Sequence, residues 1–313
     1  MLTDHLALAI DFSEASKVAL AAAFGLAKAT GCPRITVFHA VQEVVEPKGE
    51  TAESKARCQA LRAKIQEAAE RQLEAMTQQV GPPAGVNIVH EVIRGTPSRA
   101  VPAAAERVGA TLLAAGTHGR TGLNRWLKGS VAEALVRGSP LPTLVMPMGK
   151  DGVPPVDELR GLSRVLIAVD LHAEAERVLQ HGLDLAARLA PGAVAVTLLT
   201  VADPMALPEI ADDDRVLSEY REMIESEAET QLATLAQRFS TPQLSITPQV
   251  TAGDPDEQIL ETLRVTRAEL VVVGSHGRGR APIFELGSTT THVMRESPVS
   301  VLVVPLPSAA SRD

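Results

Sequence analysis

The sequence predicts an α/β fold built from two similar domains, each with a parallel β-sheet and helices on both faces. Three observations support this prediction: the chain repeats itself, each repeat alternates strand-like with helix-like segments, and aromatic residues make up only 2% of the 313 residues. A core with so few aromatic residues has to be built mainly from Val, Leu, Ile and Ala, which suits buried parallel strands packed against Ala-rich helices. Alternating strands and helices favour a parallel sheet, and right-handed crossovers then place helices on both of its faces.

The internal repeat is visible at several places in the chain. The segment AGTHGR at residues 115–120 recurs as VGSHGR at residues 273–278, 158 residues later. Near the start, the segment AID at residues 9–11 recurs as AVD at residues 168–170, 159 residues later, so one small insertion separates the copies. Glycine, proline and charged residues mark the junction as a linker. We therefore expect a first domain at residues 1–148, a linker at 149–162 and a second domain at 163–307.

Within the first copy, strands and helices alternate. Short apolar or alternating segments predict five strands, at residues 5–10, 34–40, 86–92, 111–115 and 143–146. Helices are expected between them, at the Ala-rich residues 14–29, at residues 51–79 where apolar residues recur every three or four positions, after Pro97, and from Ser130. The second copy follows the same order and ends in a strand at residues 299–304.

Charge and composition argue against several classes of function. The net charge is −8, so no broad basic surface is available for nucleic acid as the main partner. The sequence lacks a signal-like N-terminus and an apolar run of about 18 residues, and we expect no contact with a membrane. Cys32 and Cys58 have no metal-ligand spacing and are expected to be free thiols of a cytoplasmic protein. We identify no metal site and no pairing of a nucleophile with a base.

The loop after the fourth strand carries the strongest functional signal. In both copies it reads Gly-x2-Gly-x9-Gly-Ser, from Gly116 to Ser130 and from Gly274 to Ser288. In doubly wound sheets, ligands bind beyond the carboxyl ends of the strands where the strand order reverses. Glycines let backbone N–H groups approach an anion, and the unpaired N–H groups at a helix start favour it further. A tight turn followed by a serine N-cap fits the same residues, and duplication would copy a turn as readily as a site.

Two common phosphate-binding motifs are absent from the sequence. There is no Gly-x4-Gly-Lys-Ser/Thr segment, and no Gly-x-Gly-x-x-Gly follows the first strand. The spacing that is present resembles the ATP-binding motif of the universal stress protein family. The segments GTHGRTGLNRWLKGSVAEALVRGSPLPTLVM and GSHGRGRAPIFELGSTTTHVMRESPVSVLVV resemble two C-terminal halves of that family, and LALAIDFSEAS resembles its N-terminus. The resemblance covers essentially the whole chain outside the linker.

This resemblance implies two tandem Rossmann-like domains of the adenine nucleotide α-hydrolase type, each with a five-stranded parallel sheet. It also implies one ATP site per domain, with Mg²⁺ accompanying the nucleotide, and a role as a stress-response regulator or nucleotide-dependent signalling protein. The aspartate after the first strand would face adenine and ribose, apolar residues would line the adenine slot, and the glycines and serine would hold the phosphates. The implied site residues are Ala9, Asp11, Ala40, Ala115, Gly116, Gly119, Arg120, Gly129, Ser130 and Val131 in the first copy. In the second copy they are Ala168, Asp170, Val201, Val273, Gly274, Gly277, Arg278, Gly287, Ser288 and Thr289.

The second copy departs from the first beside its aspartate. Leu171 and His172 replace Phe12 and Ser13, so a hydroxyl that could cap the following helix is lost, and Thr200 stands where the first copy has His39. We interpret His39 as a packing residue and not as a ligand.

Alternatives to ATP-dependent regulation remain open at this point. One is a scaffold that binds no nucleotide, and another is an enzyme, either a slow ATP hydrolase or a relative that releases AMP and pyrophosphate. We assign no catalytic residue and expect at most weak ATPase activity. The fifth strands are apolar, and as open sheet edges they would promote aggregation. We therefore expect them to pair within one chain as a pseudo-dimer, and a further homodimer is left open.

Overall fold

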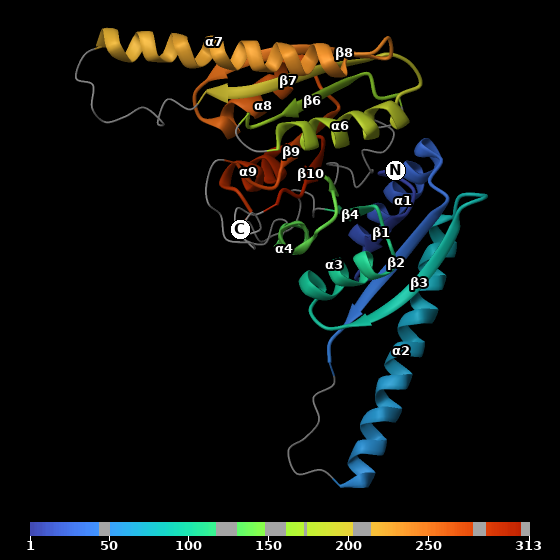
Figure 1. Cartoon of the computed structure of the whole chain (residues 1–313). Helices are drawn as coiled ribbons and strands as arrows, with labels where there is room; N and C mark the ends of the chain where they lie inside the picture. The colour runs from blue at the N-terminus through green and yellow to red at the C-terminus, as the bar shows by residue number, and fades with distance from the viewer. Residues whose placement is uncertain are drawn as a thin grey trace. The chain divides into compact units, whose positions relative to one another are not determined.

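The computed structural model describes residues 1–43, 51–116, 130–147, 161–171, 174–202, 214–277 and 286–307. The described residues up to Leu141 form one compact unit, and residues 142–147 join those from residue 161 onward in a second. Figure 1 labels most of the helices and strands of the two units. Among the described residues, no helix combines the length and the apolar character that a membrane span requires.

The first unit contains a parallel sheet with the strand order β3-β2-β1-β4. Its strands are β1 (Leu6–Ala9), β2 (Arg34–Val41), β3 (Asn87–Arg94) and β4 (Leu112–Gly116). Its helices are α1 (Glu14–Thr30), α2 (Ala52–Val80), α3 (Pro97–Arg107) and α4 (Ser130–Gly138). The chain steps outward from β1 to β3 and then returns to β4 on the other side of β1. Right-handed crossovers therefore place α1 and α2 on one face of the sheet and α3, which packs against α4, on the other.

The second unit repeats this arrangement with the parallel order β10-β9-β6-β7-β8. Its strands are β6 (Arg164–Ala168), β7 (Val194–Ala202), β8 (Leu244–Ala252), β9 (Leu270–Gly274) and β10 (Ser300–Val304). Its helices are α6 (Ala175–Leu189), α7 (Asp214–Phe239), α8 (Pro255–Thr266) and α9 (Ser288–Glu296). The predicted fold class, a tandem α/β protein with Rossmann-like sheets, is confirmed.

One strand of the first copy lies in the second unit. β5 (Thr143–Met146) runs antiparallel to β10, with Leu144 opposite Leu302 and Val145 opposite Val301. All four of these side chains are at most 1% exposed. The pairing covers what would otherwise be an apolar sheet edge with unpaired backbone groups.

The buried core is mainly aliphatic, as the composition predicts, although Phe24 and Phe38 are also buried in the first unit. In β1, Leu6 and Leu8 are at most 1% exposed, and in β6, Leu166 and Ile167 are fully buried. α6 approaches this core closely at Gly182. A Cβ on that glycine would stand only 2.8 Å from Cδ1 of Ile167 and 3.1 Å from Cγ2 of Val272. The absence of a side chain at this position therefore sets how closely α6 packs against β6 and β9.

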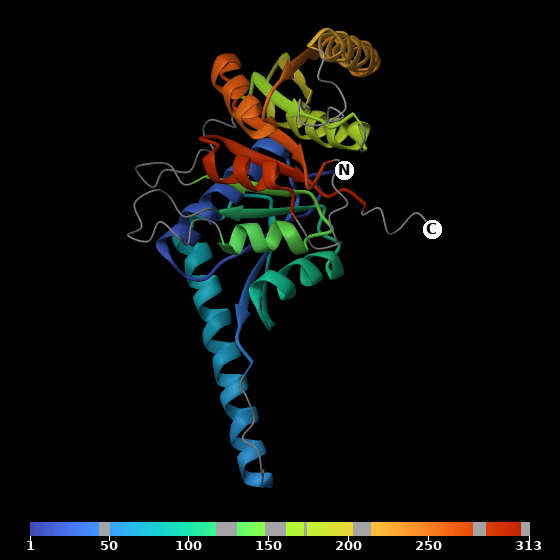
Figure 2. The same cartoon turned by 90° about the vertical axis from the view of Figure 1, so that its left-hand side faces the viewer.

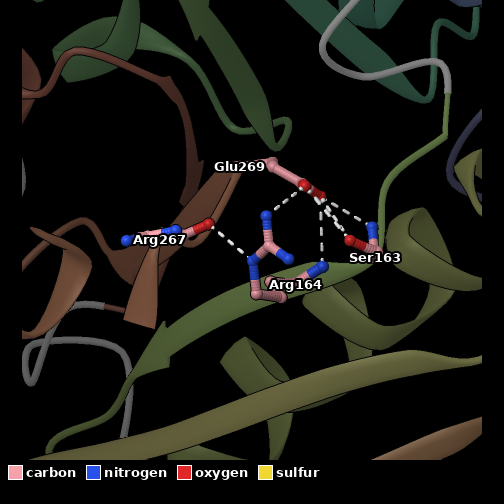
Figure 3. A network of polar contacts seen from close by, with 4 residues as sticks. All are labelled: Ser163, Arg164, Arg267 and Glu269. Carbon is pink, nitrogen blue, oxygen red and sulfur yellow. Dashed lines mark hydrogen bonds and ion pairs between the residues drawn. The ribbon is translucent and has the colours of Figure 1, made fainter. Parts of the chain in front are cut away.

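A polar clasp joins the amino ends of β6 and β9, as Figure 3 shows. The carboxylate of Glu269 accepts hydrogen bonds from the backbone N–H of Ser163 at 2.6 Å and of Arg164 at 3.1 Å. It also accepts one from Nη2 of Arg164 at 2.9 Å, while Nε of Arg164 donates to the carbonyl of Arg267. Because the clasp aligns the starts of two neighbouring strands, it helps to fix the register with which their carboxyl ends meet.

The first unit makes the equivalent contact with different chemistry. There, Oγ1 of Thr111 accepts a hydrogen bond from the backbone N–H of His5 at 3.0 Å, just before β4 and β1 begin. The same backbone position is thus held by a hydroxyl in one copy and by a carboxylate in the other.

Removing the clasp is expected to destabilise the second unit. Glu269→Ala would leave the N–H groups of Ser163 and Arg164 without their acceptor, and hydrogen bonds to a charged group contribute about 1.5–3 kcal/mol. We expect a loss of about 2 kcal/mol in the free energy of unfolding, measured by urea denaturation of the full chain. Glu269→Thr copies the first unit and should recover part of the loss. Equal stability of wild type and Glu269→Ala would show that the clasp contributes nothing.

Candidate functional site

The strand order reverses between β1 and β4 in the first unit and between β6 and β9 in the second. In open α/β sheets, this reversal opens a crevice beyond the carboxyl ends of the two strands. Asp170 follows β6, and the segment Gly274–Gly277 begins at the end of β9. The described part of the second glycine loop therefore lies where the topology predicts a ligand.

The structure brings Asp170 and Gly277 together at this crevice. A Cβ on Gly277 would stand 3.0 Å from Oδ2 of Asp170, so the glycine backbone lies directly against the carboxylate. Gly277 is exposed and Asp170 is half-buried, which leaves the pair accessible from solvent. A side chain at position 277 would enter the space that this carboxylate borders.

Backbone hydrogen bonds hold the loop in place. The N–H of Ser275 donates to the carbonyl of Val304 at 2.8 Å, and Oγ of Ser275 accepts from the N–H of Leu306 at 3.0 Å. The N–H of Gly287 donates to the carbonyl of Ser275 at 2.9 Å, and a Cβ on Gly287 would stand 3.3 Å from Cα of His276. Gly287 therefore allows the start of α9 to approach the loop closely.

The start of α9 has no side-chain cap. Gly287 is the N-cap residue, no side chain accepts a hydrogen bond there, and the first turn holds no acidic residue. Ser288 is the first helical residue and is exposed, whereas Oγ1 of Thr290 donates to the carbonyl of Gly274 at 2.7 Å and ties the helix to the end of β9. A serine that caps the helix, one interpretation of the motif, is therefore not what this copy contains. Uncapped N–H groups at a helix start favour an anion.

In the first unit, the aspartate is bound into the turn that leads to α1. Oδ1 of Asp11 accepts hydrogen bonds from Oγ of Ser16 at 2.6 Å and from the N–H of Ser13 at 3.0 Å. Ser13 is the N-cap residue of α1. Asp11 itself is exposed, so the turn holds its carboxylate where solvent can reach it, just after β1.

The glycines that end β4 and β9 have a packing role. A Cβ on Gly116 would stand 3.0 Å from Cβ of Ala19, and one on Gly274 would stand 2.8 Å from Cδ1 of Leu306. A side chain at either position would force its neighbour to shift, whether or not a phosphate lies nearby. Of the glycines at the described end of the second loop, Gly277 is the one whose added Cβ would meet the carboxylate and not the core.

His39 and Thr200 make equivalent contacts with a backbone carbonyl although their side chains differ in chemistry. Nδ1 of His39 lies 2.9 Å from the carbonyl oxygen of Ile10, and Oγ1 of Thr200 donates to the carbonyl of Val169 at 3.0 Å. Both residues thus hold the carbonyl immediately before the site aspartate. In the sequence alone, the two copies differ at this position. The partner that both side chains share is a backbone carbonyl, which a comparison of side chains does not reveal.

Phe12 has a backbone conformation that is uncommon for a residue with a side chain. Its φ is +64°, in the left-handed region. The centroid of its ring lies 4.1 Å from the centroid of the His39 ring. Such conformations cost free energy and often occur at functional sites. The ring contact places an aromatic pair beside Asp11 that the second copy, with Leu171 and Thr200, does not have.

The remaining predicted residues divide into three groups. Six residues of the predicted adenine slots lie at the carboxyl ends of strands and are buried or half-buried: Ala9, Ala40, Ala115, Ala168, Val201 and Val273. In the first turns of the helices, Val131 is 52% exposed and Thr289 is half-buried. Gly119, Arg120, Gly129, Arg278 and the side chain of Ser130 lie outside the described residues.

A polar cluster near the start of α8 was not predicted. Nδ1 of His292 in α9 lies 3.4 Å from Oδ2 of Asp256 in α8, and a hydrogen bond with Asp256 raises the pKa of the Asp254 carboxyl. Gly253, which lies just before α8, repeats Gly95 of the first copy 158 residues later. Among the described residues, no three His, Cys, Asp or Glu side chains are grouped so that they could hold a metal ion.

The family comparison matches the internal repeat of the sequence. The sequence model of the universal stress protein family matches residues 3–147 and, separately, residues 161–305. The chain belongs to the universal stress protein family. Its two matched segments are the two copies of the internal repeat, so it is a tandem universal stress protein.

Individual relatives are distant in sequence. A universal stress protein of Mycobacterium tuberculosis is 28% identical over 194 residues, which cover 62% of this chain and only 61% of the relative's length. A universal stress protein of Mycolicibacterium smegmatis is 27% identical over 278 residues, 86% of each chain. A solved universal stress protein from Archaeoglobus fulgidus superposes with a TM-score of 0.62 at 20% identity, covering 97% of this chain and 99% of that one. The structural likeness supports the fold.

Proposed function

We propose that this universal stress protein binds ATP, with one site in each domain, and that the nucleotide regulates its conformation or its partners. The observation that carries the proposal lies at the carboxyl ends of β6 and β9, where Gly277 lies against Asp170 and Gly287 leaves the start of α9 uncapped. A carboxylate suits the hydroxyls of a ribose, and an uncapped helix start suits phosphates. These two features border one crevice at the topological switch point.

In the proposed second site, the triphosphate lies at the start of α9, where backbone N–H groups and the exposed Ser288 bind it. Asp170 binds the ribose, and Ala168, Val201 and Val273 provide the apolar slot for adenine. In the first site, Asp11, Gly116 and Ser130 take the corresponding roles. Gly119, Gly129 and the arginines Arg120 and Arg278 are proposed to surround the phosphates.

The residues present fit a nucleotide better than they fit a protein-bound metal. No described group of three carboxylate, imidazole or thiolate side chains could hold a cation by itself. Mg²⁺ commonly binds through phosphate oxygens and keeps several of its waters, and we propose that it enters with the ATP in this way. We assign no catalytic residue, and we propose binding with at most slow hydrolysis.

We further propose domain limits of 1–148 and 163–307, with the fifth strands joining the domains as a pseudo-dimer. The antiparallel register of β5 and β10 and the burial of Leu144 and Leu302 support this arrangement. We also propose that the protein acts in the cytoplasm, because neither Cys32 nor Cys58 is joined in a disulfide, as expected in a reducing compartment.

Calorimetric titration of the full chain with ATP and Mg²⁺ tests the proposal. We expect two nucleotides per chain. Assays for ADP and for AMP with pyrophosphate in the same samples should show at most slow turnover. Absence of binding would favour a scaffold that uses no nucleotide, and rapid release of AMP and pyrophosphate would favour an enzyme. Either result would contradict the proposal.

A further inference from the structure

The N-terminal half of α2 presents an apolar side chain between basic ones. Leu61 is 49% exposed, with Arg57 one turn before it and Lys64 one turn after it, both also exposed. Residues 55–66 contain four basic side chains and no acidic one. Both views of the molecule show this half of α2 extending past the strands of its own unit (Figures 1 and 2). The buried residues of α2 lie in its C-terminal half: Ala69, Leu73, Met76 and Thr77.

The N-terminal half of α7 presents the opposite charge pattern. Met223 is 56% exposed, with Glu219 and Glu227 one turn before and after it, and both glutamates are exposed. Residues 218–229 contain five glutamates and one arginine. The buried side chains Leu232 and Ala236 again lie in the C-terminal half of the helix. Leu61 and Met223 are two of the five large apolar side chains that the described part of the chain exposes most.

We propose that these two helix halves form an interface between copies of this chain. The basic surface of α2, defined by Arg57, Leu61 and Lys64, would pack against the acidic surface of α7, defined by Glu219, Met223 and Glu227, in a second copy. Charge complementarity selects this occupant, since two copies of α2 would bring basic residues together and two copies of α7 would bring acidic residues together. A reciprocal pair satisfies both surfaces of both copies, as an isologous dimer requires.

The apolar residues add a desolvated centre to the charge pairing. Leu61 would pack against Met223, which removes both side chains from water. The flanking charged residues would lie at the rim of the interface, where they determine partner choice and salt dependence. The interface does not involve the proposed ATP sites. It therefore stands or falls separately from the proposed function.

Charge reversal tests the proposal through the oligomeric state. We expect the wild-type chain to sediment as a dimer in about 0.1 M NaCl and to dissociate in about 1 M NaCl, where the Debye length falls from ~10 Å to ~3 Å. Arg57→Glu with Lys64→Glu makes both surfaces acidic, and Glu219→Lys with Glu227→Lys makes both basic. Each double variant alone should associate at least about tenfold more weakly, since several attractive pairs become repulsive.

Mixing the two double variants provides the decisive result. In the mixture, the acidic α2 of one variant faces the basic α7 of the other, and the two original surfaces face each other in return, so a heterodimer should form. Lys28→Glu with Arg99→Glu changes the net charge equally on other helices and should leave the wild-type dimer intact. Circular dichroism checks that each variant folds. A monomeric wild type, a dimer insensitive to the double variants, or a mixture that stays monomeric would overturn the proposal.

Discussion

Gly277→Val is expected to remove one of the two ATP sites and to leave the fold intact. The first added carbon would already stand 3.0 Å from Oδ2 of Asp170, so the carboxylate would have to move to make room for the side chain. We expect ATP to bind this site roughly 100-fold more weakly, equivalent to about 2.7 kcal/mol. Calorimetric titration should then report one nucleotide per chain where the wild type binds two.

Gly192→Val is the matched control for this variant. A Cβ on the exposed Gly192 would meet no atom within 4 Å, so the same chemical change has no structural consequence there. It should retain two sites. Gly116 and Gly274 are less suitable positions, because a side chain at either would also press on Ala19 or Leu306. Unchanged stoichiometry and affinity in Gly277→Val would show that ATP does not bind beside Gly277 and Asp170.

Gly182→Val is expected to destabilise the second unit strongly. A side chain at this buried position of α6 would overlap Ile167, whose Cδ1 would lie 2.8 Å from the added Cβ, and would press on Val272. Overpacking a well-filled core costs about 1–3 kcal/mol, and the restricted rotamers of valine in a helix add to that. We expect a loss of about 3 kcal/mol, seen as a lower urea midpoint for the second unit.

The comparison with Gly192→Val again separates crowding from the loss of a glycine, since the control adds the same side chain in open space. A Gly182→Val chain that unfolds at the wild-type urea concentration would mean that α6 can move away from the sheet at little cost.

The order of the elements was predictable because local signals agree with the overall pattern. The strand expected at residues 34–40 is β2 (Arg34–Val41), and the helix expected at 51–79 is α2 (Ala52–Val80). Thr51 caps α2, and Gly31 ends α1 with a φ of +69°, so both boundaries have a local cause. The repeated glycine spacing marked the loop after the fourth strand, and topology places that loop and the loop after the first strand at one edge of the sheet.

The contacts that depend on distant backbone atoms could not be predicted. Glu269 looks like an ordinary surface charge in the sequence, and its role depends on two N–H groups more than a hundred residues earlier. Thr200 and His39 differ in chemistry, yet both hold a backbone carbonyl. The sequence likewise did not distinguish Gly274, which a packing contact explains, from Gly277, which lies against the aspartate.

A crystal structure of the full chain grown with ATP and Mg²⁺ tests the central claim most directly. We predict phosphate oxygens about 2.7–3.2 Å from the first N–H groups of α9, with the ribose hydroxyls at Asp170. Nucleotide bound elsewhere on the chain, or crevices that stay closed by their own side chains at saturating ATP, would contradict the claim even though the universal stress protein fold would stand.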